Sequence, residues 1–356
     1  MRASRERWGD LGNAWYAAAR SDELGARAPL SRTVLGVRVA LWRRRDGTAA
    51  AVFDRCLHRN ARLGAGVVVD GCLACPYHGW TYAADGRVVG VPSLAPGEAP
   101  PALALPSYPV REEGGLVWVW VGDRPPAELP ARVPFSMPHW RESGWGAYYM
   151  TTRFGNDVTN LVENFMDVPH TVFVHRGWFR SPRRRRVPTR VARTADSVLV
   201  TYDQPRDSIG FTNWLMNPRD LPLTHTDKFY LPNTTRVDYV WGDEGDPHGR
   251  AFVITSTCTP ISERDTMVYT LISYKLGAFN PLAGLWLPAY TRRVIGQDVT
   301  IMANQGESLA HHGQPAFHGT EADTIHEHIE ALRAWAEAGR PEPGPEPRVD
   351  AIEMWV

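Results

Sequence analysis

The stretch CLHRNARLGAGVVVDGCLACPYHGW, residues 56–80, decides the fold of the N-terminal part of this chain. It holds Cys56 and His58 in a C-x-H pattern and, after 16 intervening residues, Cys75 and His78 in a C-x-x-H pattern. Two thiolates and two imidazoles on paired loops can hold one metal centre, either a tetrahedral zinc ion or a [2Fe-2S] cluster. The sequence therefore predicts a metal clamp built from two short loops.

The other cysteines favour the iron-sulfur interpretation over zinc. Only four cysteines occur in the 356 residues, and Cys72 also lies in this stretch, so the crowding beside histidines indicates a metal site and not a disulfide framework. Cys72 and Cys75 form the C-x-x-C pair that zinc sites often use. Because that pair would leave one of the two histidines without a metal, we expect Cys72 to be structural.

Short strand-like runs surround the clamp and predict a small antiparallel β domain. The runs TVLGVRVALW (33–42) and AAAVF (49–53) are joined by a turn with Asp46-Gly47, and GGLVWVWVGD (114–123) reads as one more strand. The stretch RPPAELPARVPFSMP (124–138) holds five prolines and no sustained periodicity, which is typical of a connector. We therefore expect one domain over residues 1–125 and a second over residues 126–356.

The pattern CLHRN…CPYHGW resembles the signature of Rieske proteins, and its CPYHGW half resembles the ring-hydroxylating type of oxygenase. The resemblance implies that Cys56 and Cys75 bind one iron of a [2Fe-2S] cluster and that His58 and His78 bind the other. Histidine ligation raises the reduction potential above that of an all-cysteine cluster. The resemblance also implies a hydrogen bond from Tyr77 to a cysteine sulfur, although packing around the clamp is the simpler expectation for this residue.

A second group of metal-binding residues follows in NFMDVPHTVFVH, residues 164–175. On an ideal α-helix a five-residue step turns through about 500°, so His170 and His175 would diverge by roughly 140° and could not share a metal. A shared metal requires a broken helix, and Pro169 supplies a plausible break. Taken alone, the segment fits equally well a pair of hydrogen-bonded histidines near a domain interface.

The spacing D-x-x-H-x-x-x-x-H resembles the iron-binding motif of Rieske non-heme iron oxygenases. The resemblance implies that His170 and His175 bind a mononuclear iron and that a distant aspartate completes a triad of two histidines and one carboxylate. The best candidate is Asp298 in RRVIGQDVTIMANQ, where Gln297 stands at a position that is glutamate in many relatives.

Two further residues of this motif receive roles from the resemblance. Asp167 is expected to bridge a cluster histidine of one subunit and an iron histidine of the next by hydrogen bonds, which implies a homo-oligomer, usually a trimer. Asn164 stands beside the iron ligands, where several monooxygenases also carry asparagine.

The resemblance implies an α+β fold, with a Rieske antiparallel β domain followed by a helix-grip (START-like) antiparallel sheet with helices. Strand-like runs over 191–275 agree with this, and Ile325, Ile329, Leu332 and Trp335 mark an amphipathic helix near the C-terminus. The apolar stretch 276–290 is interrupted by prolines and is expected to be core. Candidates for lining a substrate cavity, with core packing the simpler expectation for each, are Asn213, Trp214, Met216, Asn280 and Trp286.

The composition limits the possible partners. Lysine plus arginine and aspartate plus glutamate each number 39, so no net field steers the chain toward nucleic acid or anionic lipid. The charged first residues contain no apolar run of signal-peptide length, which favours a cytoplasmic location. The resemblance implies oxidation of a small organic molecule by O2 at an Fe(II) site, with electrons from NAD(P)H through a reductase or ferredoxin.

Hydroxylation is the favoured outcome, and O- or N-demethylation, desaturation and oxidative cyclisation are alternatives on the same machinery. The single chain with Asn164 and Asp167 resembles the monooxygenase and demethylase branch. A Rieske electron carrier or redox sensor without a catalytic iron is an alternative of another class. A zinc-clamped binding protein is a third. The sequence does not indicate the substrate.

Overall fold

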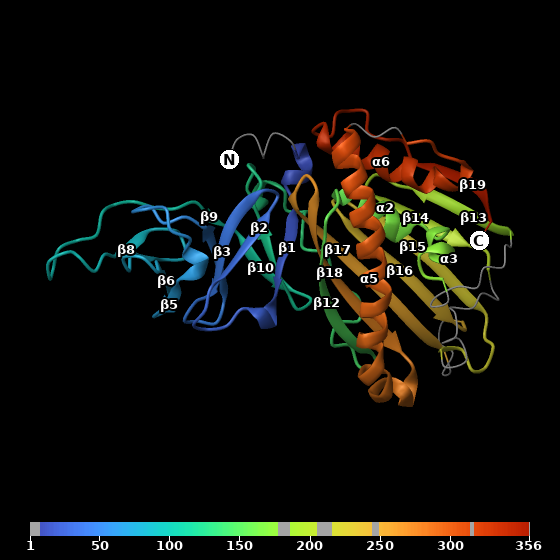
Figure 1. The fold of residues 1–356 in the computed structure, drawn as a ribbon, viewed down its shortest axis with the longest axis horizontal. Helices are drawn as coiled ribbons and strands as arrows, with labels where there is room; N and C mark the ends of the chain where they lie inside the picture. Colours follow the sequence, from blue (N-terminus) through green and yellow to red (C-terminus); the bar gives the residue numbers. More distant parts are fainter. Residues whose placement is uncertain (1–7, 177–185, 205–215, 244–248, 314–316, 356) are drawn as a thin grey trace. The chain divides into compact units, whose positions relative to one another are not determined.

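The computed structural model describes residues 8–176, 186–204, 216–243, 249–313 and 317–355. The chain divides into two compact units (Figure 1). The first runs through Ser136 and includes Thr259–Ile261, and the second takes in Met137–Cys258 and the chain from Ser262 onward. The proline-rich connector, up to residue 136, thus lies with the first unit.

The first unit is built from three small antiparallel sheets. Their strand orders are β1-β11-β10, β2-β3-β4-β9 and β5-β6-β7-β8. The strand bounds are β1 Trp15–Arg20, β2 Leu30–Val34, β3 Val37–Arg43, β4 Ala49–Phe53, β5 Val67–Val69, β6 Cys72–Ala74, β7 Thr81–Tyr82, β8 Val88–Gly90, β9 Ser107–Tyr108, β10 Val110–Glu113 and β11 Leu116–Trp120.

The predicted β hairpins form in this unit because turn residues stand where the chain reverses. Gly47, between β3 and β4, adopts φ +82°, a conformation that glycine reaches without a Cβ penalty. Apolar residues of β3, β4 and β7 then pack with Cys56 and Cys75 in one buried cluster that includes Trp42 and Tyr82. The core of the unit therefore extends up to the predicted metal clamp.

The second unit holds one large antiparallel sheet with the order β12-β18-β17-β16-β15-β14-β13-β19. The strands β13 and β14 alternate buried and more exposed residues, so one face turns toward the core, whereas β17 and β18 are buried along most of their length. The strand bounds are β12 Gly146–Phe154, β13 Arg186–Arg193, β14 Ser197–Tyr202, β15 Leu223–Tyr230, β16 Thr234–Trp241, β17 Arg250–Ser262, β18 Asp265–Lys275 and β19 Arg348–Trp355.

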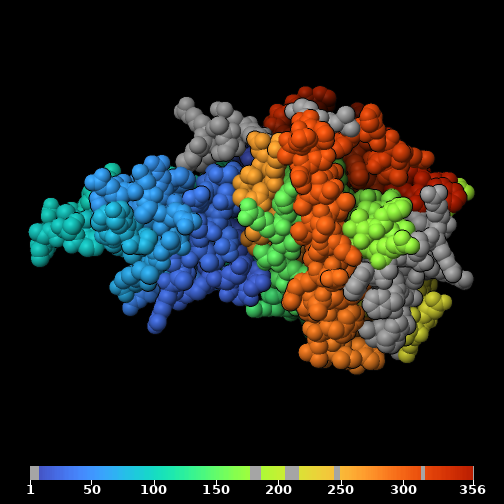
Figure 2. Space-filling view, in the orientation of Figure 1, coloured from blue at the N-terminus to red at the C-terminus, as the bar shows by residue number. Residues whose placement is uncertain are grey.

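Helices pack on this sheet, and the longest runs along its face (Figure 1). Figure 2 shows α5 at the surface of the unit with α3 beside it. The stretch 276–290, expected as core, forms much of the start of α5, with Pro281 in its first turn and Pro288 inside it. The helix bounds are α2 Val158–Met166, α3 His170–Phe173, α5 Asn280–His312 and α6 Thr324–Glu337.

The α+β fold with a β-rich N-terminal unit and a large antiparallel sheet carrying long helices confirms the expected fold class. Within the described residues, no helix combines the length and apolar character needed to cross a membrane.

Candidate metal centres

The two loops that carry the predicted cluster ligands share one backbone pattern. The first follows β4, and the second joins β6 to β7. In the first, Cys56 N–H donates to Ala61 O and Cys56 O accepts from Asn60 N, at 2.9 and 3.0 Å. In the second, Cys75 N–H donates to Trp80 O at 2.8 Å and Cys75 O accepts from Gly79 N at 3.1 Å.

This repeated pattern needs a left-handed residue four positions after each cysteine. Asn60 has φ +62° and Gly79 has φ +71°, and asparagine and glycine tolerate this region best. A Cβ on Gly79 would also lie 2.8 Å from Pro92 Cγ. The sequence CLHRN…CPYHG thus fixes two similar tight loops, each of which carries a cysteine and a histidine.

The four predicted ligands lie together in this clamp. Cys56 and Cys75 are 1% and 5% exposed, and the rings of His58 and His78 are 4.5 Å apart. The Nδ1 atom of His58 is buried and has no hydrogen-bond partner among the described residues. Two buried thiols and a histidine nitrogen without a partner fit a metal cluster, which would use these atoms as ligands.

Aromatic residues of the second loop surround the clamp. The Trp80 ring stacks on His58 at 5.1 Å with planes 7° apart. Tyr77 is 65% exposed and its ring packs 3.8 Å from that of His78. The Tyr77 ring therefore lies at the surface, against the ring of His78.

The tyrosine hydroxyl beside a sulfur belongs to Tyr82. Its oxygen lies 3.1 Å from Cys56 Sγ and accepts a hydrogen bond from Leu57 N at 3.0 Å. Burial raises the pKa of Tyr82, and the neighbouring Cys56 sulfur raises it further. Sequence reasoning missed Tyr82. Its position in the short strand that directly follows the second loop, two residues after Trp80, could have indicated it.

The predicted break before His170 is confirmed by the structure. Asp157 caps the start of α2 by accepting from Thr159 N at 2.7 Å, and the helix ends at Met166. A separate short helix, α3, begins at His170 directly after Pro169. Because α3 ends at Phe173, His175 lies beyond the helix and is not bound by the divergence of a continuous helix. The ring centroids of His170 and His175 are 5.2 Å apart.

Asp298 reaches the same place from the middle of α5. Asn156, just before α2, binds this helix through two hydrogen bonds. Asn156 Nδ2 donates to Met302 O at 2.8 Å and to Gln305 Oε1 at 2.9 Å. Gly306 allows the close approach, because a Cβ there would lie 2.3 Å from Gly155 O. The buried contact between α5 and the start of α2 thereby positions Asp298 over the two histidines.

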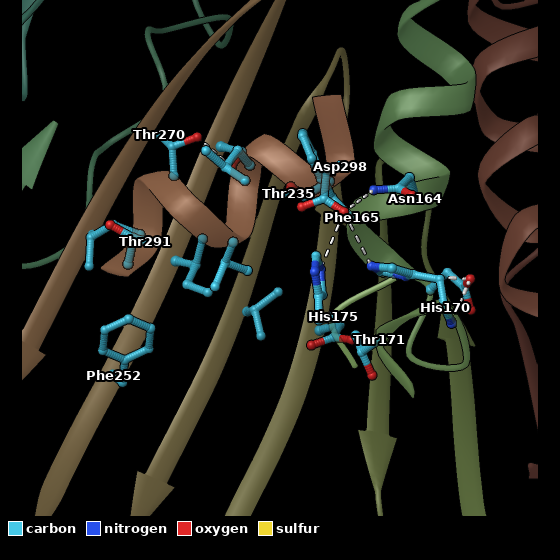
Figure 3. Close-up of a pocket in the computed structure, with 18 of the residues that line it drawn as sticks. Asn164, Phe165, His170, Thr171, His175, Thr235, Phe252, Thr270, Thr291 and Asp298 are labelled. Atoms are coloured by element: carbon cyan, nitrogen blue, oxygen red, sulfur yellow. Dashed lines mark hydrogen bonds and ion pairs between the residues drawn. The ribbon is translucent and has the colours of Figure 1, made fainter. Parts of the chain in front are cut away.

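These three residues form a compact group in which each offers one ligand atom within 4.8 Å of the others (Figure 3). Asp298 Oδ1 lies 3.6 Å from His170 Nε2 and 3.3 Å from His175 Nε2. Asn164 Nδ2 approaches the same oxygen at 3.5 Å. Two imidazoles and one carboxylate on one side of a cavity fit a non-heme Fe(II) site with open positions.

The outer nitrogens of both histidines face polar side chains. His175 Nδ1 lies 2.9 Å from Gln297 Oε1. His170 Nδ1 lies 3.5 Å from Asp167 Oδ2, too far for a hydrogen bond, and has no hydrogen-bond partner among the described residues. The Gln297 acceptor selects the His175 tautomer with its hydrogen on Nδ1 and leaves Nε2 free for a metal. Gln297, which stands where many relatives have glutamate, therefore still provides an acceptor for His175.

The electrostatics of the group suit a cation. Burial lowers the pKa of His170, but the carboxylates of Asp167 and Asp298 outweigh it and raise that pKa to about 9. Burial alone would raise the pKa of Asp298, yet the two histidines lower it. The site thus already favours positive charge next to Asp298, which a divalent ion supplies more strongly than protons do.

A cavity of about 130 Å³ opens beside the triad, between α2, α3, α5 and the inner face of the sheet. One water needs only ~10–15 Å³ by this kind of measure, so the space suits a small organic molecule. Its walls are mainly apolar, with hydroxyls at Thr235, Ser256, Thr270 and Thr291.

Sequence reasoning did not find these walls. Met216 packs with the partly buried Trp286 in an apolar cluster, whereas Asn213 and Trp214 lie outside the described residues. Asn280 begins α5 and binds the backbone of Leu276 and Gly144.

Comparisons with known proteins agree with both centres. A model of the Rieske [2Fe-2S] domain matches residues 14–109, and a model of the vanillate O-demethylase oxygenase C-terminal domain matches residues 156–329. The oxygenase component of dicamba O-demethylase from Stenotrophomonas maltophilia is 40% identical over 167 residues, which is 46% of this chain and 47% of that protein. The vanillate O-demethylase oxygenase subunit of a Pseudomonas species is 36% identical over 46% of this chain and 44% of its own length.

These alignments span about half the length of the curated relatives. The structural likeness extends further. The crystal structure of dicamba monooxygenase bound to dicamba superposes with a TM-score of 0.77 at 26% identity and covers 92% of this chain and 99% of that one. The two family models describe both halves of the chain, and the first identifies the clamp as a Rieske [2Fe-2S] centre and not a zinc site. The chain therefore belongs to the Rieske-type non-heme iron oxygenases, as an oxygenase component of the branch that contains the vanillate and dicamba O-demethylases, with a Rieske cluster and a non-heme iron as its cofactors.

Proposed function

We propose that the chain catalyses the O2-dependent hydroxylation of a C–H bond in a small, mainly apolar molecule. The overall reaction is R–H + O2 + 2 e⁻ + 2 H⁺ → R–OH + H2O. The group of His170, His175 and Asp298 at the wall of an apolar cavity carries this proposal. When bound there, the iron supplies reductive activation of O2.

The residues of the chain divide the remaining tasks. We assign the cluster to Cys56, His58, Cys75 and His78, and the iron to His170, His175 and Asp298. Gln297 orients the His175 imidazole, the Asp167 carboxylate lies beside the imidazole of His170, and Asn164 approaches the Asp298 carboxylate. The apolar walls exclude water and hold the substrate in one orientation, so pocket geometry selects which hydrogen is replaced.

O-demethylation is a second candidate, favoured by the relatives named dicamba and vanillate O-demethylase. It is the same reaction applied to a methoxy group, because hydroxylation of –O–CH3 gives –O–CH2OH, which breaks down to the alcohol or phenol and formaldehyde.

Electrons are proposed to come from NAD(P)H through a reductase, with or without a ferredoxin, as the name oxygenase component implies for the relative. We assign the Rieske domain to residues 1–125 and the iron domain to 126–356, and we propose a homotrimer. In it, Asp167 would join the cluster of one subunit to the iron histidine of the next, since a carboxylate accepts from both imidazoles.

The test uses the holoenzyme with NADH, a surrogate reductase and ferredoxin, and a panel of methoxyarenes. We expect O2-dependent formaldehyde or hydroxylated product from the wild type and about three irons per chain. A count near two irons, with cluster absorbance and no product, would support the electron-carrier alternative.

Asp167→Asn tests the proposed bridge. We expect this variant to keep both metals and to turn over roughly a hundredfold more slowly. The reason is that an amide has only one acceptor atom, its oxygen, whereas a carboxylate can accept from one imidazole at each oxygen. Single-turnover reduction of the iron by the prereduced cluster is the measurement, and undiminished transfer refutes the assignment.

A further inference from the structure

The part of the cavity wall formed by β15, β16 and β17 carries one carboxylate among mainly apolar side chains. On this inner face, Asp227 of β15 stands opposite Val237 of β16, which stands opposite Ile254 of β17. In the next row, His225 pairs with Tyr239 and Tyr239 with Phe252. Asp227, Val237, Ile254, Tyr239 and Phe252 all line the cavity.

Asp227 is held by two neighbouring side chains. Tyr202 Oη donates to its Oδ2 at 2.8 Å, and His225 Nε2 lies 3.0 Å from its Oδ1. Because a carboxylate only accepts, we assign the hydrogen to His225 Nε2. The His225 ring is itself clamped between Tyr202 and Tyr239, each at 4.4 Å. The carboxylate therefore has a fixed position and direction.

This group is almost completely buried. Asp227 is 2% exposed, His225 1% and Tyr202 3%. Among the described residues, Asp227 forms an ion pair with His225 when that ring is protonated, and with no lysine or arginine; His225 Nδ1 has no hydrogen-bond partner. A carboxylate in such surroundings is costly unless a positive group or further donors approach it.

Asp238, on the neighbouring strand, shows how the same sheet treats a carboxylate that serves only structure. It pairs with Lys228 at 2.8 Å and with Arg236 at 2.8 Å. Asp227 has no such partner, and the described residues that line the cavity include neither lysine nor arginine. The cavity thus offers a fixed acceptor, and its described walls carry neither lysine nor arginine that would bind an anionic substrate.

We propose that Asp227 is a substrate-binding residue that receives a protonated amine, with the apolar body of the substrate lying along Val237, Ile254 and Phe252 toward the iron residues. This rests on the hydroxylase function proposed above and specifies its substrate class. Each carboxylate oxygen keeps acceptor capacity beyond its present hydrogen bond, so an ammonium group can bind without displacing Tyr202 or His225. The substrate class differs from vanillate, an anion.

The test compares three probes that share a methoxyphenyl group and differ in charge: 4-methoxybenzylamine, 4-methoxybenzyl alcohol and 4-methoxybenzoate. Binding to the holoenzyme is measured anaerobically by calorimetry, so that no turnover occurs. We expect the amine to bind at least tenfold more tightly than the benzoate, with the alcohol between them.

Asp227→Asn keeps the shape of the side chain and removes its charge. We expect it to weaken amine binding at least tenfold and to change alcohol binding less than threefold. Asp238→Asn, on the neighbouring strand, is the matched control and should leave the order of the three probes unchanged. If Asp227→Asn does not fold, the order of the three probe affinities measured with the wild type still tests the amine site.

Benzoate binding equal to or tighter than amine binding overturns the inference, as does a lack of measurable amine binding. These results are separate from those that test the proposed function. Product formation from a neutral or anionic methoxyarene, with the amine rejected, would uphold the hydroxylase and refute the amine site. Tight amine binding without any product under reducing conditions would uphold the amine site and refute the hydroxylase.

Discussion

The cluster loops and the iron group are both metal sites, but the chain assembles them in different ways. The cluster residues lie within residues 56–78 on two loops with the same hydrogen-bond pattern, and His78 at their tip is exposed. The iron residues span 170–298 and come from α3, the turn after it and α5. The first site depends on local backbone geometry, and the second depends on how a long helix packs on the rest of its unit.

The largest expected effect separates the two sites by metal content. Cys56→Ala should abolish the visible absorbance of the cluster and keep the mononuclear iron, whereas Asp298→Ala should keep the absorbance and lose the mononuclear iron. Each change removes one ligand of one centre. Iron analysis with electron paramagnetic resonance is the measurement, and Cys72→Ala is the control that should retain both metals. Loss of both metals in either variant would contradict the independence of the sites.

The same contrast explains what the sequence could predict. The clamp could be predicted because all of its parts are neighbours in sequence: its ligands, its turn residues Asn60 and Gly79, and its flanking strands. The break at Pro169 was also local. The position of Asp298 over His170 and His175 was available only through the family resemblance, since it depends on Asn156 and Gly306 fastening α5.

The walls of the cavity could not be predicted from spacing. Asp227, Val237 and Ile254 meet across three strands, and their register follows from pairing that no local pattern specifies. A lone aspartate in the run LTHTDKFY reads as an ordinary polar residue of a strand. Only its burial with Tyr202 and His225 distinguishes it.

A smaller effect tests how far the iron group depends on its surroundings. Gln297→Leu removes the acceptor 2.9 Å from His175 Nδ1 and should weaken Fe(II) binding by roughly 10–100-fold, because the imidazole loses its fixed tautomer and orientation. Gln297→Glu keeps an acceptor and should retain binding. Fe(II) titration of the metal-free mononuclear site measures both. Equal affinity in the leucine variant would show that packing alone orients His175.

The stability of the second unit should depend on pH through Glu163 of α2. Burial raises the pKa of Glu163 to about 8. Repulsion from the carboxylates of Glu330, Asp157 and Asp323 contributes to the rise, and the nearby guanidinium of Arg333 partly offsets it. The folded state therefore holds a proton that the unfolded state releases near pH 4.5. The contribution of Glu163 to stability falls as pH rises from about 4.5 to 8, by on the order of a few kcal/mol.

Glu163→Gln should remove this dependence. Its melting temperature is expected to exceed that of the wild type by roughly 5–10 °C at pH 8.5, with a much smaller difference at pH 5. Calorimetry of the second unit's transition in the full chain is the measurement, and Glu327→Gln, exposed on α6, is the control. A difference that does not grow with pH would rule out Glu163 as the cause.

The smallest expected effect concerns the cluster, where a single hydrogen bond acts on the redox potential. Tyr82 Oη lies 3.1 Å from Cys56 Sγ, and a thiolate ligand can only accept, so the hydroxyl donates and stabilises the extra electron of the reduced cluster. Tyr82→Phe should lower the potential by roughly 40 mV, since a hydrogen bond contributes ~1 kcal/mol and a tenfold change for one electron is ~59 mV. Tyr77→Phe, whose ring is exposed, should leave the potential unchanged in the same voltammetric measurement. An equal shift in both variants would mean that general polarity around the clamp, and not this hydrogen bond, sets the potential.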